Sequence, residues 1–450
     1  MLTFLSPGVP AFEAARRRLD RRLLSFENAL TEQAQARILQ SFGAPLSPPE
    51  VAERLIEAVR LRGDEAVVEW TARLDGAVLS PETLRVPEQD LDAALRDCPA
   101  ELRCALEKAA ANVRNYQESL LATREGSIDL GGIRSGWRID PIDAAGIYVP
   151  GGTAAYPSSV IMNALPALVA GVRRVAVASP PRRDGTIHPG VLAACALVGV
   201  REVYRVGGAI AIAAFALGTT SIPRVSKVAG PGNLFVTLAK RALYGVCGID
   251  LLAGPSEICI LADGTADPEV VAADLLSQAE HDELSHSIVV TDSPTLAERL
   301  PAALEKRLAT LPRRAIAEAS IRKNAAAFLV PDLEAGCALV SEIASEHVEI
   351  LAADPERWLP KISNAGAIFV GASAPEALGD YLAGPSHTLP TGGAARFSSG
   401  LSSLDFVRRT SIVRAPPAAL ASAAPAVIAL AEAEGLTAHA ESVRVRLRNK

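Results

Sequence analysis

The spacing of hydrophobic residues changes character along the chain. In residues 54–73 and 90–121, apolar side chains recur every three or four positions with charges between them, which predicts amphipathic helices. Beyond about residue 146, short β-rich runs alternate with alanine-rich runs. The alternation predicts strands at 172–179, 201–206, 225–229, 257–262 and 287–292, and helices at 189–199, 208–218, from 233, and at 268–280. Such alternation predicts an α/β fold with a parallel sheet that helices cover on both faces.

The same alternation resumes after residue 295. It predicts helices at 295–311 and 332–345, strands at 328–330 and 366–370, and a polar, glycine-rich loop at 384–401. The last fifty residues are rich in alanine and proline and end in charges. They are too short and too broken for a core of their own. We therefore expect a tail that packs on something else, such as another subunit.

Length, charge and cysteine usage narrow the class of protein. The 450 residues exceed the roughly 250–300 at which a single core stops growing, so two large domains are expected. A net charge of −6 gives no general attraction to nucleic acid or anionic lipid. No apolar run reaches the roughly 20 residues of a membrane span, and the start of the chain does not resemble a secretory signal. Six cysteines without a C-x-x-C pair indicate a reduced, cytoplasmic protein.

Glycine-rich turns mark three places where a phosphate could bind. They are Gly151-Gly152, Gly207-Gly208 and Gly230-Pro231-Gly232, and each follows a strand or opens a helix. A helix N-terminus with nearby glycines offers free N–H groups to an anion. Glycine is equally the ordinary way in which a strand turns into a helix, and the sheet's first strand–helix turn lacks the G-x-G-x-x-G pattern. Each turn alone therefore favours a structural role.

Histidines near acidic or amide side chains are the second candidate chemistry. Gln278 and His281 lie three residues apart on a predicted helix, Asp380 precedes the loop that holds His387, and Glu434 lies near His439. Such a donor set suits zinc, although a lone histidine is more often a structural hydrogen-bonding group. Glu346-His347, at the end of the predicted helix 332–345, is either an acid–base pair or an exposed helix-end pair.

Several blocks of sequence, in order along the chain, resemble one known family. They include GIYVPGGTAAYPSSVIMNALPALVAGV from Gly146, VAGPGNLFVTLAKR from Val228, GIDLLAGPSEICILAD from Gly248, LLSQAEHDE from Leu275 and ASEHVEI from Ala344, then SNAGAIFVG from Ser363, EALGDYLAGPSHTLPTGGAARFSSGLSSLDFVRRTSIV from Glu376 and EGLTAHAESVRVR from Glu434. By these blocks the sequence resembles the histidinol dehydrogenase family from about residue 54 onward.

The resemblance implies roles for particular residues. The zinc ligands would be Gln278, His281, Asp380 and His439, the last reaching in from a partner subunit. The acid–base pair would be Glu346 and His347. The substrate site would be lined by Ser256, His387 and Glu434 in addition to Gln278, His281, His347, Asp380 and His439.

For the dinucleotide, the resemblance implies contacts from Tyr148 and Asn233. The family usually has a glutamine that also contacts NAD in the stretch G-G-A-Q-A-I-A-A, and here that position is Ile210. An isoleucine side chain forms no hydrogen bond. Because one neutral hydrogen bond contributes about 0.5–1.5 kcal/mol, its loss would weaken NAD binding only a few-fold.

The implied activity is the oxidation of L-histidinol through L-histidinal to L-histidine, with one Zn²⁺ per subunit and two NAD reduced. The implied fold has two incomplete Rossmann-like domains with parallel sheets. An N-terminal helical arm would comprise residues 1–44, a first α/β domain 45–147 and 258–400, and a second, nucleotide-side domain 148–257. An extended tail, 401–450, would complete shared active sites in a homodimer. No membrane or nucleic acid partner is expected.

Three alternatives remain beside this one. The scaffold could serve another diol or amino alcohol, because a fold does not determine its substrate; the presence of His387 and Glu434 favours histidinol. A cysteine-dependent aldehyde dehydrogenase would need an activated thiol, whereas Cys259 lies in a predicted buried strand. An inactive relative that serves as a binding protein is indicated only by Ile210.

Overall fold

The computed structural model describes residues 2–22, 30, 32–121, 125–151 and 156–448. Gly152 of the first glycine turn therefore lies outside the described residues, as do parts of the predicted arm and the last two residues of the tail. Two compact units result. The first contains Met1–Leu120 and Asp143–Phe406, and the second contains Leu121–Ile142 and Val407–Lys450. Among the described residues, no helix combines the length and the hydrophobicity that crossing a bilayer requires.

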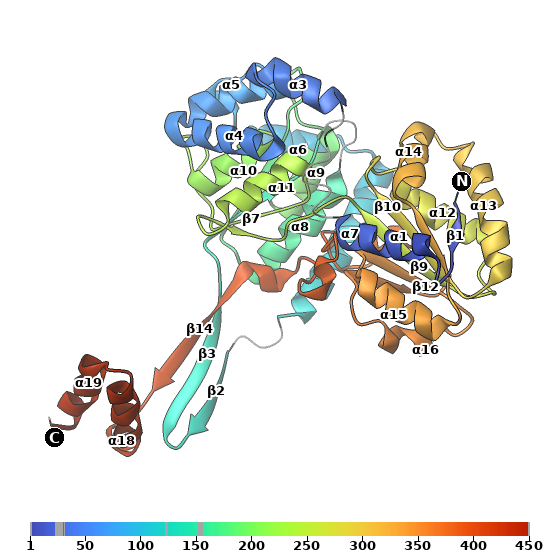
Figure 1. Ribbon diagram of the computed structural model, residues 1–450. Helices are drawn as coiled ribbons and strands as arrows, with labels where there is room; N and C mark the ends of the chain where they lie inside the picture. Colours follow the sequence, from blue (N-terminus) through green and yellow to red (C-terminus); the bar gives the residue numbers. More distant parts are fainter. Residues whose placement is uncertain (1, 23–29, 31, 122–124, 152–155, 449–450) are drawn as a thin grey trace. The chain divides into compact units, whose positions relative to one another are not determined.

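A six-stranded parallel sheet forms one half of the first unit (Figure 1). Its order is β1 (Phe4–Leu5), β11 (Ala326–Leu329), β10 (His286–Thr291), β9 (Glu257–Ala262), β12 (His347–Leu351) and β13 (Ala367–Val370). The associated helices are α1 (Pro10–Asp20), α12 (Pro268–Ala279), α13 (Pro294–Leu308), α14 (Arg314–Asn324), α15 (Leu333–Ile343), α16 (Pro355–Trp358) and α17 (Glu376–Tyr381).

Alternating residues of the central strands place this sheet between two helical layers. Ile258 and Ile260 of β9 pack with α12, α13 and α14. Cys259 and Leu261 pack with α1 and α15 on the other face. A run of consecutive apolar residues, here 258–262, is what a strand of a parallel sheet buried on both faces requires. The prediction of an α/β fold with helix-covered parallel sheets is confirmed.

A five-stranded parallel sheet forms the other half of the first unit, in the order β6 (Glu202–Arg205), β5 (Arg174–Ser179), β4 (Ala144–Tyr148), β7 (Lys227–Ala229) and β8 (Gly248–Ile249). The helices of this half are α3 (Glu32–Phe42), α4 (Pro48–Arg62), α5 (Asp64–Asp75), α6 (Glu88–Arg96), α7 (Ala100–Ser119), α8 (Pro157–Ala170), α9 (Pro189–Val198), α10 (Gly208–Leu217) and α11 (Leu234–Leu243). Helices α4, α5, α10 and α11 share one apolar core with this sheet.

The sheets group the chain differently from the expected domain limits. Strand β4, expected in the first domain, pairs with β5 and β7 of the five-stranded sheet. Strand β1, expected in the N-terminal arm, pairs with β11 of the six-stranded sheet. The sheet to which a strand belongs is decided by backbone pairing. The order of elements along the chain does not reveal that pairing. The domain limits within the first unit remain a prediction.

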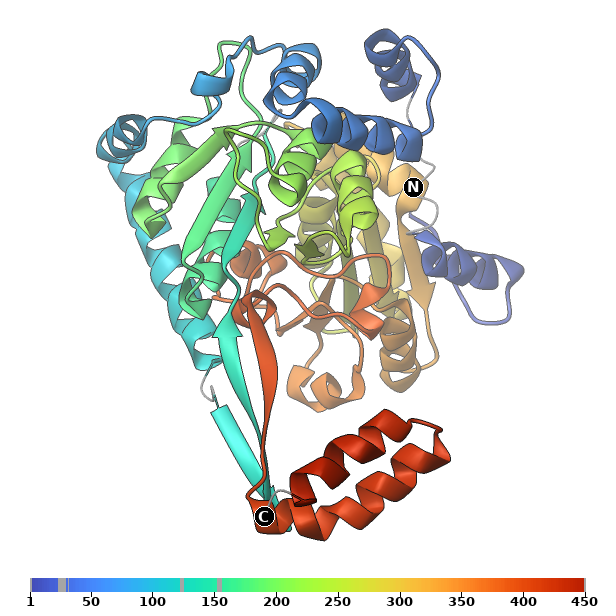
Figure 2. The same cartoon turned by 90° about the vertical axis from the view of Figure 1, so that its left-hand side faces the viewer.

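The second unit is built from three antiparallel strands and two helices. Strand β3 (Ile133–Pro141) lies between β2 (Glu125–Leu130) and β14 (Val407–Arg414). Figure 2 shows α18 (Pro417–Ala433) and α19 (Thr437–Arg448) side by side after β14. The tail was predicted as too short and too broken for a core of its own; its two helices, α18 and α19, were not predicted from the sequence.

Two of the long helices predicted from spacing are interrupted. Gly63, at φ 54°, separates α4 from α5. Asp97–Pro99 separates α6 from α7, and Pro99 directly precedes the second of these helices. Strand β12 was missed, because no glycine or proline marks the end of the helix before it.

Candidate active site

Glu346 and His347 lie between a helix and a central strand. Helix α15 ends at Ile343, and Ala344 then takes the left-handed conformation, with φ 52° and ψ 55°. His347 opens β12, beside Ile258 of β9. Of the two alternatives for this pair, the exposed helix end is wrong, because both side chains are buried, with His347 3% exposed.

A backbone contact fixes the tautomer of His347. Its Nδ1 lies 3.0 Å from the carbonyl oxygen of Glu257, which can only accept, so Nδ1 carries the proton. Nε2 is left as the basic nitrogen, and it is buried without a hydrogen-bond partner among the described residues. Burial lowers the pKa of His347, and the nearby Glu376 opposes this effect. His347 is thus a neutral base with a free lone pair.

Glu346 is held by the same neighbour. Its Oε2 accepts a hydrogen bond of 2.9 Å from the backbone N–H of Glu257 and lies 3.7 Å from Nδ1 of His347. Burial raises the pKa of Glu346 well above its ordinary value. A carboxylate with a raised pKa is a stronger base, which is what activation of a water molecule requires.

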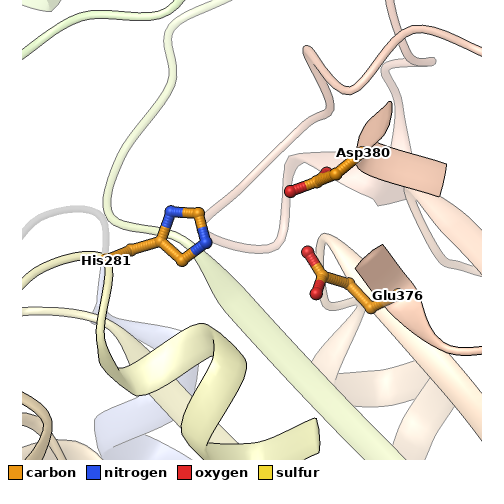
Figure 3. A group of neighbouring side chains, drawn as sticks. All are labelled: His281, Glu376 and Asp380. Carbon is orange, nitrogen blue, oxygen red and sulfur yellow. The ribbon is translucent and has the colours of Figure 1, made fainter. Parts of the chain in front are cut away.

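A histidine and two carboxylates face one another close to His347 (Figure 3). His281 follows α12, and Glu376 and Asp380 both come from α17. One donor atom from each residue lies within 4.8 Å of the other two. His347 Nε2 lies 3.8 Å from Asp380 Oδ1 and 3.9 Å from Glu376 Oε1. His347 and this group of possible ligand atoms therefore lie in one region.

The electrostatics of the group favour a cation. Burial, and then the negative charge of Glu376, raise the pKa of Asp380 to about 9. Glu376 Oε1 and Gln278 Oε1 are buried without hydrogen-bond partners among the described residues. An imidazole with carboxylate and amide oxygens is a donor set that zinc accepts. The residues present therefore fit a divalent ion.

Glu376 was not predicted from the sequence. It is 2% exposed and belongs to the same group as His281 and Asp380. A signal was available, because Glu376 precedes Asp380 by four residues and therefore shares its helix face. Glu376 is not among the ligands that the family resemblance implies.

The glycine-rich loop brings His387 to the same region. Its Nδ1 donates to the backbone carbonyl of Asp380 (3.1 Å), and its Nε2 accepts from Ser159 Oγ (3.2 Å). Burial lowers the pKa of His387 to about 4, so this ring is neutral. Ser256 lies directly before Glu257 and is half-buried. His387 thus contacts Asp380, which lies near His347. Ser256 is next in the chain to Glu257, which contacts both Glu346 and His347.

The two predicted tail residues lie in the second unit. Glu434 directly follows α18, and His439 lies in the first turn of α19. Both are exposed on that unit. Their contribution to the zinc and substrate site stays a prediction.

The candidate NAD residues lie in the five-stranded half. Tyr148 ends β4, is buried, and its hydroxyl accepts from the N–H of Gly208 at 3.1 Å. Asn233 is exposed and caps α11, accepting from the N–H groups of Phe235 and Val236. Asn233 therefore has a structural function whatever it binds.

A family model described as histidinol dehydrogenase matches residues 47–447. The chain belongs to the histidinol dehydrogenase family. A histidinol dehydrogenase from Ruegeria pomeroyi is 48% identical over 95% of this chain and 98% of its own length. One from Cereibacter sphaeroides is 51% identical over 88% of this chain and 91% of its own.

A solved histidinol dehydrogenase, from Elizabethkingia anophelis, has the same fold. Its TM-score is 0.87 at 31% identity, covering 99% of this chain and 98% of that one. The similarity thus extends over both units of the chain. Membership of the histidinol dehydrogenase family makes the protein an oxidoreductase by class.

Two residues bear on the alternatives to a histidinol dehydrogenase. Burial raises the pKa of Cys259 to about 12, so this thiol is not activated. Ile210, at the position of the family's usual glutamine, is 2% exposed and packs in the core of the five-stranded half. Its side chain therefore contributes to core packing. An isoleucine in this role does not require that the protein has lost its activity.

Proposed function

We propose that this chain oxidises L-histidinol through L-histidinal to L-histidine, in two successive hydride transfers to NAD at the end of histidine biosynthesis. Family membership supports this proposal, and one geometric observation carries it. The free Nε2 of His347 points at the group of His281, Glu376 and Asp380, with 3.8 Å to Asp380 Oδ1. A base beside a cation site is what the oxidation of a chelating amino alcohol needs.

We assign one Zn²⁺ per subunit to Gln278, His281, Asp380 and, from a second copy of the chain, His439. When bound, zinc would hold the substrate through its imidazole and amino nitrogens and so position it. The unpartnered buried oxygen of Gln278 and the raised pKa of Asp380 support this ligand set. Ser256, His387 and Glu434 are the proposed further contacts to the substrate.

His347 takes the hydroxyl proton of the alcohol at Nε2 as hydride leaves the carbon. Its neutral form is maintained by burial, and its tautomer by the carbonyl of Glu257. Glu346 removes a proton from the water that adds to the aldehyde in the second half of the reaction. The burial that raises the pKa of Glu346 makes it suitable for this task. An enclosed site also retains the reactive aldehyde between the steps.

NAD is proposed to bind at the five-stranded sheet, against Tyr148 and Asn233. Helices α10 and α11 begin there, after β6 and β7, and their N-terminal N–H groups suit the pyrophosphate. Gly230 approaches the backbone of Tyr148 so closely that a Cβ would lie 2.0 Å from its carbonyl oxygen. The turn at Gly230 therefore accepts no side chain.

The decisive experiment measures NADH formation from L-histidinol with zinc-loaded protein. We expect two NADH per histidinol, and loss of activity after chelation that added zinc restores. L-histidinal should also be oxidised, giving one NADH. A folded, zinc-loaded protein that forms no NADH from either compound would overturn the proposal. Oxidation of a different amino alcohol in preference to histidinol would favour the alternative substrate class.

We further propose a cytoplasmic homodimer with shared sites. Exposed apolar residues on the second unit support a partner surface: Val413, Val427, Leu430 and Leu436. Mixing His439→Ala chains with Glu346→Gln chains tests the sharing. A shared site predicts recovery of activity, because each mixed dimer contains one site with neither change. Verified mixed dimers without activity would mean that each site comes from one chain.

A further inference from the structure

A buried arginine of the N-terminal segment contacts the region of the acid–base pair. Arg22 lies two residues after α1, and its side chain is 2% exposed. Nε and Nη2 bind the two carboxylate oxygens of Glu257, the second at 2.7 Å. Nη1 donates to the carbonyl of Leu19 at 2.5 Å. The guanidinium is thus fixed in a planar, bidentate pair.

Glu257 connects this arginine to both proposed catalytic residues. Its backbone N–H donates to Glu346 Oε2 (2.9 Å), and its carbonyl accepts from His347 Nδ1 (3.0 Å). Its carboxylate, besides binding Arg22, accepts from the N–H of Gly392 in the glycine-rich loop (2.8 Å). A shift of Glu257 would therefore move His347, Glu346 and the glycine-rich loop together.

Arg22 also holds the turn that leads into the pair. Nη2 donates to the carbonyl of Ile343 (3.0 Å) and approaches that of Ala344 at 3.5 Å. Ala344 is, among the described residues, the one non-glycine residue with positive φ. Such a backbone is unfavourable for an L-residue and persists only when its surroundings hold it. The arginine supplies two of these restraints.

We propose that Arg22 is a positioning residue for Glu346 and His347, which gives the N-terminal segment a function in the reaction. The roles of those two residues rest on the proposed function. Arg22 touches neither of them; it acts through Glu257 on one side and through the Ile343–Ala344 turn on the other. Its loss would leave binding of histidinol and NAD largely intact and reduce turnover.

The test compares Arg22→Lys and Arg22→Met with Arg16→Met. Arg16 is the matched control: Nη2 also joins the N-terminal segment to α15, through hydrogen bonds to both carboxylate oxygens of Glu342 (2.6 and 2.7 Å). Its side chain is 32% exposed, however, and its described hydrogen bonds go to Glu13 and Glu342 and not to Glu257. We expect Arg22→Lys to lower kcat about 10- to 100-fold, as a small misplacement of reacting groups does. The KM values and the zinc content should stay near wild type, and Arg16→Met should retain wild-type kcat.

A double variant separates positioning from simple stabilisation. Arg22→Met alone leaves a buried, unpaired carboxylate and is expected to lower the unfolding temperature strongly. Arg22→Met with Glu257→Gln removes both charges and should recover that temperature without recovering kcat. If the double variant recovered kcat as well as the unfolding temperature, Arg22 would only stabilise the fold and would not position the pair. Folded Arg22→Lys with wild-type kcat would also overturn the proposal.

A readout that does not need turnover keeps this inference distinct from the proposed function. In protein labelled with ¹⁵N-histidine, the His347 signals, assigned by their loss in His347→Asn, should report a protonated Nδ1. We expect Arg22→Lys to broaden or shift that Nδ1–H signal, and Arg16→Met to leave it in place. An unchanged signal would contradict the positioning role even if histidinol proved not to be the substrate.

Discussion

The two parallel sheets of the first unit place their candidate residues at opposite ends of their strands. In the five-stranded sheet the strand order reverses between β4 and β7, and Tyr148 and Gly230 lie at the carboxyl ends there. In the six-stranded sheet the order reverses between β9 and β12, yet Glu257 and His347 are the first residues of those strands. Ligands of open α/β sheets ordinarily bind outside carboxyl ends at such a reversal.

Topology alone would thus point to the candidate residues of the five-stranded sheet and would miss those of the six-stranded sheet. After β9, at the carboxyl end, Asp263 and Asp267 accept hydrogen bonds from Thr265 and Glu269 and so serve a turn and a helix start. The helix–strand connections at the amino end instead bring in His281, Glu346 and His347. The position of the candidate catalytic residues is therefore set by the connections between helices and strands and not by the strand direction.

The charges of the two regions also differ. In the five-stranded half, buried Asp250 pairs with Lys240 at 2.6 Å. In the six-stranded half, Glu349, Glu376 and Asp380 are largely buried near one another, and burial raises the pKa of Glu349 to about 9. The pair of Lys240 and Asp250 has no net charge. The cluster of three carboxyl groups instead needs a bound proton or a cation to offset its negative charge.

The largest effect should come from the base. We expect His347→Asn to lower kcat by about 10²–10⁴-fold, the range of general acid–base catalysis, because no other group replaces Nε2. Steady-state NADH formation checks this, with zinc content and unfolding temperature as controls. If the folded variant kept near-wild-type turnover, the reaction could not depend on His347 at the amino end of the six-stranded sheet.

The next effect concerns the metal. His281→Ala combined with Asp380→Asn should weaken zinc binding by more than about 100-fold, since loss of even an outer-sphere partner costs 10–100-fold. Metal analysis after dialysis against a weak chelator measures this directly. His188→Ala is the matched control, because that histidine caps α9 in the five-stranded half. Stoichiometric zinc in the double variant would refute the assigned ligands.

A smaller effect follows from the buried carboxyls. The folded pKa of Glu349 lies above its ordinary value of 4.5, because of burial and then the charge of Asp274. The folded protein therefore keeps a proton that the unfolded chain releases, so stability falls as pH rises from about 4.5 to about 9.

Glu349→Gln should reduce this pH dependence. We expect a difference of at least about 1 kcal/mol, the equivalent of roughly one pKa unit, across that range. Urea unfolding at several pH values, with the same zinc loading in both proteins, gives the comparison. The amide can still accept the bond from Glu376 N, which Glu349 Oε1 accepts at 2.8 Å. Parallel pH profiles for the two proteins would contradict the expectation.

The smallest effect lies at the nucleotide side. Ile210→Gln should lower the NAD KM a few-fold at most, since one neutral hydrogen bond contributes about 0.5–1.5 kcal/mol. Because position 210 is buried, the polar glutamine side chain should also make the variant less stable. Ile212→Gln, buried in the same core, is the control for the stability loss without the gain in affinity. An unchanged NAD KM in Ile210→Gln would show that this position no longer faces the cofactor.

Local patterns account for most of the elements that were predicted. Strand β9 and the starts of α9, α10 and α12 fall where alternation, proline and glycine place them. Strand β12 and the turn before it were missed, because Ala344 adopts a backbone that alanine does not signal. Family resemblance selected His281 and Asp380. The spacing of four residues placed Glu376 on the helix face of Asp380, but only the fold shows that Glu376 also meets His281.

By itself, the sequence determined the helix–strand alternation and the family, because these depend on patterns within single segments, and through the family resemblance it named candidate residues for binding and reaction. Only the tertiary structure decided which of them meet. Arg22 and Glu257, 235 residues apart, form one buried pair, and the same glutamate orients Glu346 and His347. Contacts over such separations depend on how sheets and helices pack, which no local pattern contains.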